Sequence, residues 1–193
     1  MKKDIIIAGV GGQGILSIAT TIGMAALEMN LFLKQSEVHG MSQRGGDVMS
    51  NMRISDKEIY SDLIPLGKAD MIISVEPMES LRYLPALSKD GWLITNSVPF
   101  KNISHYPDII EILNEIKKYP KHVLIDADGI AKELGSVKSA NIVILGAASP
   151  YLDIPLEILN IAINKIFKNK GQEVIDLNLK ALELGRNFSL KHA

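Results

Sequence analysis

Short apolar runs alternate with longer amphipathic segments along most of this chain. The short runs predict buried strands at Asp4–Ala8, Leu31–Gln35, Ala69–Val75, Gly91–Asn96 and Val123–Ile125. The longer segments carry apolar residues at helical spacing and predict helices from Gly14 to about Asn30 and at Met78–Leu87, Ile109–Tyr119, Gly129–Leu134, Pro155–Phe167 and Gln172–Gly185. Strands that alternate with helices are typical of a mostly parallel sheet covered on both faces. We therefore expect a three-layer α/β/α, Rossmann-like fold.

The pattern changes in the first third of the chain. Val48–Ile54 alternates between apolar and polar residues, and a polar stretch separates it from Ile59-Tyr60-Ser61. This arrangement predicts an antiparallel hairpin added to the parallel sheet. Further along, Asn141–Leu145 forms an apolar run that ends before Gly146. Because no linker, repeat or low-complexity segment divides the chain, we expect a single domain over residues 1–193.

The composition is that of an ordinary globular protein. Of the 193 residues, 47% are hydrophobic and 22% are charged, and the net charge is −1. The balanced charge and the 5% aromatic content argue against a nucleic-acid surface and a membrane surface. The first apolar run is too short for a signal peptide or a membrane span, so we expect a cytoplasmic protein. The absence of cysteine excludes cysteine-ligated iron–sulfur and zinc sites on this chain.

A glycine-rich turn follows the first predicted strand. Gly9, Gly11 and Gly14 match the pattern G-x-G-x-x-G, which lets a backbone approach a phosphate at the start of a helix. Three interpretations are open: a sharp turn without a ligand, a phosphate or anion site, and an NAD(P) site. The NAD(P) fingerprint also requires an acidic residue about 20 residues further on, where Lys34 stands, so it is the weakest interpretation. Gln13 has no role in that fingerprint, and we expect its amide to point out of the turn.

A second glycine-rich segment carries the densest set of polar side chains. It reads Ser36-Glu37-Val38-His39-Gly40-Met41-Ser42-Gln43-Arg44-Gly45-Gly46. A buried polar group without a partner costs about 1–3 kcal/mol, so we expect a loop that contacts a ligand or a partner chain. Arg44 and the loop backbone could hold an anion, or Glu37 and Arg44 could form an exposed ion pair worth less than about 1 kcal/mol. A catalytic role for His39 is disfavoured, because no nucleophile and acid stand beside it.

Acidic residues also follow two of the predicted strands. Glu76 and Glu79 come after one strand, and Asp126 and Asp128 come after another. Open α/β sheets bind ligands at such strand ends, but carboxylates there also cap helices and complement the helix dipole. We favour the second explanation and expect Asp128 to be the N-cap of the following helix. The histidines show no metal-ligand spacing, so we predict no metal site and identify no catalytic residue.

Taken together, these motifs resemble a known family. The chain is similar to the gamma-type subunits of 2-oxoacid:ferredoxin oxidoreductases, and within them most similar to the beta subunit of indolepyruvate ferredoxin oxidoreductase. The resemblance covers nearly the whole chain and rests on Ala8–Gly14, Ser36–Gly46, Tyr60–Pro65, Ala69-Asp70, Glu76–Glu79, Asn141–Gly146 and Asn178–Gly185. It implies that the single domain is a pyruvate/ketoisovalerate oxidoreductase gamma-type domain.

The resemblance also implies a function. Enzymes of this family use thiamine diphosphate to decarboxylate a 2-oxoacid oxidatively, pass the electrons through iron–sulfur clusters to ferredoxin, and transfer the acyl group to coenzyme A. The large (alpha) subunit holds the thiamine diphosphate and the clusters, so this chain would hold no cofactor alone and would be inactive alone. The residues implied to face coenzyme A or the partner subunit are Gly11, Gly12, Gln13, Gly14, Ser42, Gln43 and Arg44.

Two other functions compete with this one. The first is a stand-alone NAD(P)-dependent Rossmann dehydrogenase, which the missing acidic residue disfavours. The second is a noncatalytic assembly module of the same fold. The apolar helix predicted at Leu156–Phe167 fits either partner-bound function, and an isolated chain could pair as a homodimer through the same surface. The sequence does not select the 2-oxoacid, because that choice is made mainly on the thiamine-bearing subunit.

Overall fold

The sheet is the centre of the molecule and agrees with the predicted fold class. The computed structural model describes residues 1–40, 45–101 and 103–192. Within them the strands are β1 (Lys2–Val10), β2 (Phe32–His39), β3 (Asp47–Ser55), β4 (Ala69–Ser74), β5 (Leu87–Asn96) and β6 (His122–Ile125). They form one six-stranded sheet in the order β2-β3-β1-β4-β5-β6. β3 runs antiparallel to both of its neighbours, β2 and β1, whereas the pairs β1–β4, β4–β5 and β5–β6 are parallel.

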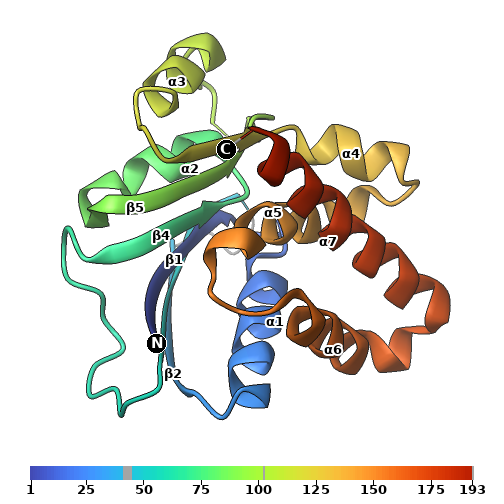
Figure 1. Cartoon of the computed structure of the whole chain (residues 1–193). Coiled ribbons are helices and arrows are strands. Elements are labelled where there is room, and N and C mark those ends of the chain that lie inside the picture. Colours follow the sequence, from blue (N-terminus) through green and yellow to red (C-terminus); the bar gives the residue numbers. More distant parts are fainter. Residues whose placement is uncertain (41–44, 102, 193) are drawn as a thin grey trace.

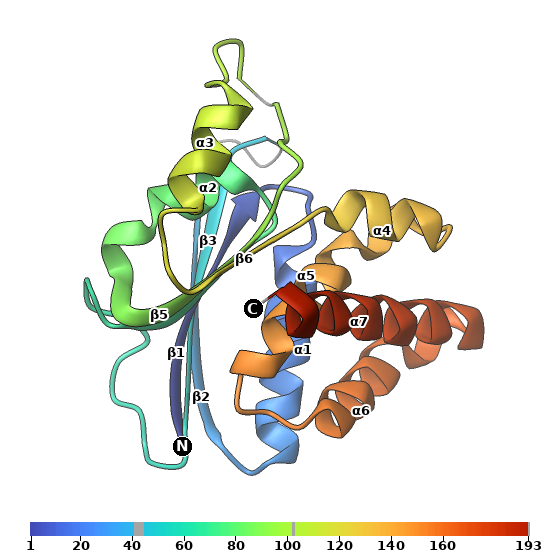
Figure 2. The ribbon, with the colours of Figure 1, turned by 45° about the horizontal axis from the view of Figure 1, so that its top comes forward.

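Helices cover both faces of the sheet (Figures 1 and 2). The helices are α1 (Ile15–Glu28), α2 (Pro77–Arg82), α3 (Ile109–Ile116), α4 (Ala127–Glu133), α5 (Ala140–Ala148), α6 (Leu156–Phe167) and α7 (Gln172–His192). In β1, Ile5 and Ile7 face a large apolar core shared with α1 and with α4 to α7, whereas Ile6 faces a smaller core shared with α2 and α3. The side chains of a strand alternate between faces, so one apolar run serves both cores. This gives the predicted three layers.

The strand predicted over residues 48–54 does not pair with residues 59–61. β3 pairs with β2 on one side and with β1 on the other, and residues 59–61 form no strand. β2 is also longer than predicted, so Ser36 to His39 belong to a strand rather than to a loop. β2 pairs with β3 along its whole length, and each residue from 32 to 39 has a partner in β3. The segment after β3, which the sequence predicted to be the second strand of a hairpin, is held by Arg53. Its guanidinium donates to the carbonyls of Ser61 and Leu63.

The apolar run at residues 141–145 is the core of α5, a helix buried along almost its whole length. It packs closely on α7, and two glycines make that contact. A Cβ on Gly146 would overlap the Leu182 carbonyl, and a Cβ on Gly185 would overlap the Val143 carbonyl. The two backbones therefore approach each other at a distance that alanine would not allow. In the sheet, α5 lies against β4, β5 and β6, and α7 lies against β6.

Other predicted bounds shift by a few residues. The helix predicted over residues 78–87 ends at Arg82, and a single 3₁₀ turn, Leu84–Ala86, leads directly into β5. Pro85 lies in that turn, where it cannot continue an α-helix. The last helix runs seven residues further than predicted, to His192. In this extension Asn187, Lys191 and His192 are exposed, whereas Ser189 is buried.

Candidate functional site

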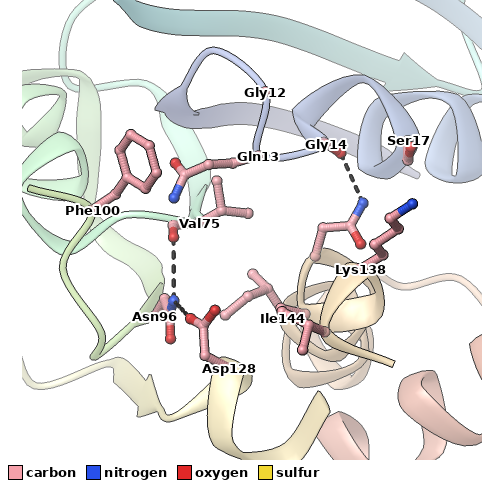
Figure 3. A pocket seen from close by; sticks show the side chains of 13 residues that line it. Gly12, Gln13, Gly14, Ser17, Val75, Asn96, Phe100, Asp128, Lys138 and Ile144 are labelled. Carbon is pink, nitrogen blue, oxygen red and sulfur yellow. Dashed lines mark hydrogen bonds between the residues drawn. The ribbon is translucent and has the colours of Figure 1, made fainter. Parts of the chain in front are cut away.

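The first glycine-rich motif forms a tight turn between β1 and α1. The Gln13 N–H donates to the carbonyl of Val10, and the Val10 N–H donates to Gln13 Oε1 at 2.8 Å. The side-chain oxygen of Gln13 therefore closes the turn, a role that the prediction of an outward-pointing amide did not include. Its nitrogen faces the adjacent cleft (Figure 3). Gln13 thus both shapes the turn and lines the space beside it.

Gly14 fixes where α1 begins. It adopts a left-handed conformation with φ of 80°, and a Cβ there would overlap Asn141 Nδ2. That nitrogen donates to the Gly14 carbonyl at 3.0 Å and so joins the turn to α5. In the described structure no side chain caps α1, and its first turn contains no acidic residue. The positive end of the α1 dipole therefore faces the cleft without a carboxylate of its own helix.

A cleft of about 470 Å³ opens beside this turn (Figure 3). It lies at the carboxyl ends of β1, β4, β5 and β6, between α1 on one face of the sheet and the segment that leads to α2 on the other. Open parallel sheets bind ligands at this kind of position. Its lining residues are Gly12, Gln13, Gly14, Ser17, Val75, Asn96, Phe100, Asp128, Val137, Lys138, Ala140, Asn141 and Ile144.

Asn96 and Asp128 form one wall of the cleft. Asn96 is buried at the end of β5, and its Nδ2 donates to Asp128 Oδ2 at 2.6 Å. Asn96 Oδ1 accepts from the Ala127 N–H at 3.1 Å. The N-cap of α4 is Asp126, which accepts from the Gly129 N–H at 2.7 Å, so the prediction that Asp128 is the cap was wrong. Two residues after this cap, Asp128 turns toward β5 and the cleft.

The opposite end of the cleft carries a cation. Lys138 lies in the short turn Val137–Ser139 that joins α4 to α5, and its side chain is exposed. Figure 3 shows Lys138 on the Gly14 and Ser17 side of the cleft, with Asp128 and Asn96 on the other side. The cleft is therefore polarised. One side offers a cation and a helix N-terminus to an anion, and the other offers a carboxylate to hydrogen-bond donors.

Glu76 and Glu79 are structural rather than cleft-lining, as the favoured interpretation predicted. Glu76 is fully buried and caps α2, because its Oε2 accepts from the Glu79 N–H at 2.8 Å. Burial raises the pKa of the Glu76 carboxyl, while hydrogen bonds from Tyr106 and two backbone amides oppose that rise. Glu79 is also buried and binds the Arg82 guanidinium with both oxygens, at 2.7 and 3.2 Å.

The second glycine-rich motif lies next to the first. The Gly11 N–H donates to the carbonyl of Gly46 at 2.9 Å, and this bond brings the two motifs together. Glu37 contacts His39 at 3.3 Å on exposed β2. The predicted site residues Ser42, Gln43 and Arg44 lie outside the described residues, as does the proposed pairing of Glu37 with Arg44. Of the predicted set, Gly12, Gln13 and Gly14 line the cleft, and Gly11 supports it through Gly46.

Comparison with known proteins decides the family. The family model described as pyruvate ferredoxin/flavodoxin oxidoreductase matches residues 4–188. The indolepyruvate oxidoreductase subunit IorB of Archaeoglobus fulgidus is 38% identical, over 98% of this chain and 96% of that protein. The chain belongs to the pyruvate ferredoxin/flavodoxin oxidoreductase family. The resemblance found in the glycine-rich motifs is thereby confirmed.

Solved structures agree with this family at the level of the fold. The pyruvate oxidoreductase subunit PORC of Thermotoga maritima has a TM-score of 0.74 and 26% identity, over 96% of both chains. The 2-oxoglutarate:ferredoxin oxidoreductase of Magnetococcus marinus, determined with 2-oxoglutarate, coenzyme A and succinyl-CoA bound, has a TM-score of 0.79 and 24% identity. The alignment covers 100% of this chain and 32% of the longer polypeptide of that enzyme. This member of the pyruvate ferredoxin/flavodoxin oxidoreductase family is a small subunit.

Sequence reasoning missed several cleft residues of this pyruvate ferredoxin/flavodoxin oxidoreductase chain. Asn96 ends a buried strand, as Glu76 nearly does, and the same argument from strand ends could have found it. Asn141 belongs to a motif of the resemblance but had no assigned role. No local pattern distinguishes Phe100 or Lys138, because only the tertiary fold brings them to the cleft. Their place in the cleft could be found only once the arrangement of α2 to α5 was known.

Two negative findings hold for the described part of the chain. Residues 1–40, 45–101 and 103–192 contain no group of three or more histidine, cysteine, aspartate or glutamate side chains placed to hold a metal ion. No helix among the same residues is long and apolar enough to cross a membrane. The full sequence contains no cysteine, so it offers no thiolate ligand to an iron–sulfur cluster.

Proposed function

We propose that this chain is the small subunit of a thiamine-diphosphate-dependent, indolepyruvate-type ferredoxin oxidoreductase and that its cleft holds part of coenzyme A. The near full-length match to an indolepyruvate oxidoreductase subunit supports the choice of enzyme. The large subunit would supply thiamine diphosphate, which carries the decarboxylation chemistry, together with the clusters that pass electrons to ferredoxin. The small subunit would form one domain in the cytoplasm and bind the acyl acceptor.

The polarised cleft is the observation that carries the coenzyme A proposal. Coenzyme A bears phosphate groups at one end, and phosphates favour helix N-termini and lysine side chains. We assign the phosphates to the Gly14 and Lys138 side, because the Asp128 carboxylate would repel them on the other side. Asp128 could accept from a hydroxyl or an amide N–H of the same ligand. The bound coenzyme A of the Magnetococcus marinus enzyme, whose fold this chain shares, is consistent with this proposal.

The strand order argues against the alternative of an NAD(P)-dependent dehydrogenase. In the dinucleotide fingerprint the acidic residue that binds the ribose stands at the end of the second strand, beside the glycine-rich turn. Here β3 lies between β1 and β2, so the end of β2 is two strands from the turn. Two strands span about 9–10 Å, which is beyond the reach of a ribose bound at that turn. The assembly-module alternative is distinguished by activity rather than by geometry.

Co-expression with the large subunit from the same genome tests the proposed function. We expect the two chains to purify together and to reduce ferredoxin when indolepyruvate and coenzyme A are both supplied. Each subunit alone should be inactive. A complex that forms but turns over no 2-oxoacid would support the noncatalytic module instead. Reduction of NAD or NADP by the small subunit alone would overturn the proposal.

A further inference from the structure

The buried carboxyl of Glu76 joins three parts of the chain. It lies just beyond β4, and its side chain has no exposed surface. One oxygen, Oε2, caps α2 through the Glu79 N–H. The other, Oε1, accepts from the Phe100 N–H at 3.3 Å and from the Tyr106 hydroxyl. The same carboxyl group therefore holds both α2 and the segment that follows β5.

Helix capping alone does not explain this glutamate. A serine or threonine would cap α2 with one oxygen, without the cost of burying a carboxyl group. Glutamate is long enough to present its second oxygen to Phe100 and Tyr106, which belong to a different element. By accepting from the Phe100 N–H, that second oxygen fixes the backbone at Phe100. The extra reach therefore serves the segment after β5 rather than α2.

Phe100 connects this network to the cleft. Its ring lines the cleft opposite Lys138 and is 44% exposed, so the packing of the core does not fix it (Figure 3). On the β5 side, the Ser97 N–H donates to the carbonyl of Ile125 at 2.9 Å. On the other side, the Tyr106 hydroxyl donates to Glu76 and so attaches the segment to the body of the protein. The backbone of Phe100 thus lies between these two attachments and is itself bonded to Glu76.

We propose that Glu76 is a positioning residue that holds Phe100 as a wall of the ligand cleft, acting through Tyr106 and the Phe100 N–H. The choice of coenzyme A as the ligand rests on the proposed function, whereas the positioning itself does not. Loss of the Tyr106 hydroxyl keeps the Glu76 cap of α2 and the Phe100 ring, but it removes the hydrogen bonds of that hydroxyl to Glu76 and to the Met78 backbone. The segment that carries the ring is then released. The ligand then binds to a cleft whose wall must be ordered during binding.

Hydrogen exchange on the ligand-free protein tests the positioning. In Tyr106→Phe we expect the amide N–H groups of residues 97, 98, 100 and 101 to exchange on the order of tenfold faster than in the wild type, because the hydrogen bonds of the Tyr106 hydroxyl that attach the segment are lost. Tyr151→Phe is the matched control. Its hydroxyl is also half-buried and bonds a side chain, Ser189 Oγ at 3.0 Å, but it lies on the other face of the sheet. Equal exchange of residues 97–101 in the two variants would overturn the positioning role.

A double-mutant cycle on the assembled enzyme tests the link to the ligand. We expect Tyr106→Phe and Phe100→Ala each to weaken coenzyme A binding about threefold to tenfold. In the Phe100→Ala background, Tyr106→Phe should cause no further loss, because the ring that it positions is gone. A merely structural role predicts losses that multiply, and that result would overturn the proposal.

The two proposals fail in different ways. If the wild-type enzyme does not bind coenzyme A, the assignment of the cleft in the proposed function is wrong, and the role of Phe100 as a wall for that ligand is wrong with it. The exchange experiment would still decide whether Tyr106 and Glu76 hold residues 97–101. If coenzyme A binds normally and the cycle is additive, the assignment of the cleft stands and the positioning proposal alone fails.

Discussion

The contact between α5 and α7 and the rim of the cleft are built on opposite principles. The helix pair is held by close backbone packing, with Gly146 and Gly185 each lying against a carbonyl of the other helix. The rim is held by hydrogen bonds to polar side chains, among them Asn96 and Glu76. The first region has no space to adjust, whereas the second can change by one bond at a time. The fold thus depends on apolar packing, and the site depends on a few directional contacts.

Substitution at the helix contact should have the largest effect on stability. In Gly185→Ala the new Cβ overlaps the Val143 carbonyl, and we expect a loss of about 3 kcal/mol in the free energy of unfolding. Urea unfolding of the purified chain measures this loss. Gly23→Ala is the matched control, because its Cβ meets only the ends of flexible side chains, Leu33 at 3.1 Å and Met52 at 3.9 Å, and alanine favours the helix. Equal stability of the two variants would mean that the helix contact is less close than described.

The same contrast explains which parts of the fold and of the cleft can be predicted from the sequence. The buried strands and most helices were predictable because their apolar residues repeat with the period of the element, as in Asp4–Ala8. The pairing of β3 was not, because the spacing of residues 48–61 also fits a local hairpin. In the site, the Gly11–Gly14 turn is a local pattern and was found. Phe100 and Lys138 were missed because they reach the cleft only through tertiary packing.

Asn96 tests whether the rim also contributes to stability. Asn96→Ala removes the acceptor of the Ala127 N–H and the donor to Asp128, and we expect a loss of about 2 kcal/mol. Asn164→Ala is the control, because that exposed side chain bonds only within its own helix, and its loss should stay within about 0.5 kcal/mol. The urea unfolding midpoint compares them. If Asn96→Ala costs no more than Asn164→Ala, these rim hydrogen bonds add nothing to the fold.

The pH dependence of stability gives the smallest effect and concerns Glu76. Burial raises its pKa above the ordinary value of 4.5, so the folded state holds the proton more tightly than the unfolded state. The resulting stability is complete below about pH 4.5 and is lost as the pH rises through the folded pKa. Glu76→Gln has no such dependence. The stability of the wild type relative to Glu76→Gln should therefore fall with rising pH, as measured by unfolding between about pH 4 and pH 8.

If the stability of the wild type relative to Glu76→Gln stayed constant or rose over that pH range, the direction of this pKa shift would be contradicted. The experiment also sharpens the contrast between the two regions, because the two glycines and the residues that their added Cβ atoms would overlap are not titratable. Gly185→Ala should accordingly lose the same stability at each pH. A change confined to Glu76→Gln would assign the pH dependence to the rim.

The affinity of the assembled enzyme for coenzyme A tests the central claim, that the cleft beside the glycine-rich turn binds this ligand. Isothermal titration should compare the wild type with Lys138→Ala. Lys170→Ala serves as the control, because it removes an exposed lysine that does not line the cleft. We predict that Lys138→Ala binds coenzyme A about tenfold more weakly, since a charge-assisted contact with phosphate is lost, and that Lys170→Ala binds like the wild type. Equal affinity of all three proteins would contradict the assignment of the cleft.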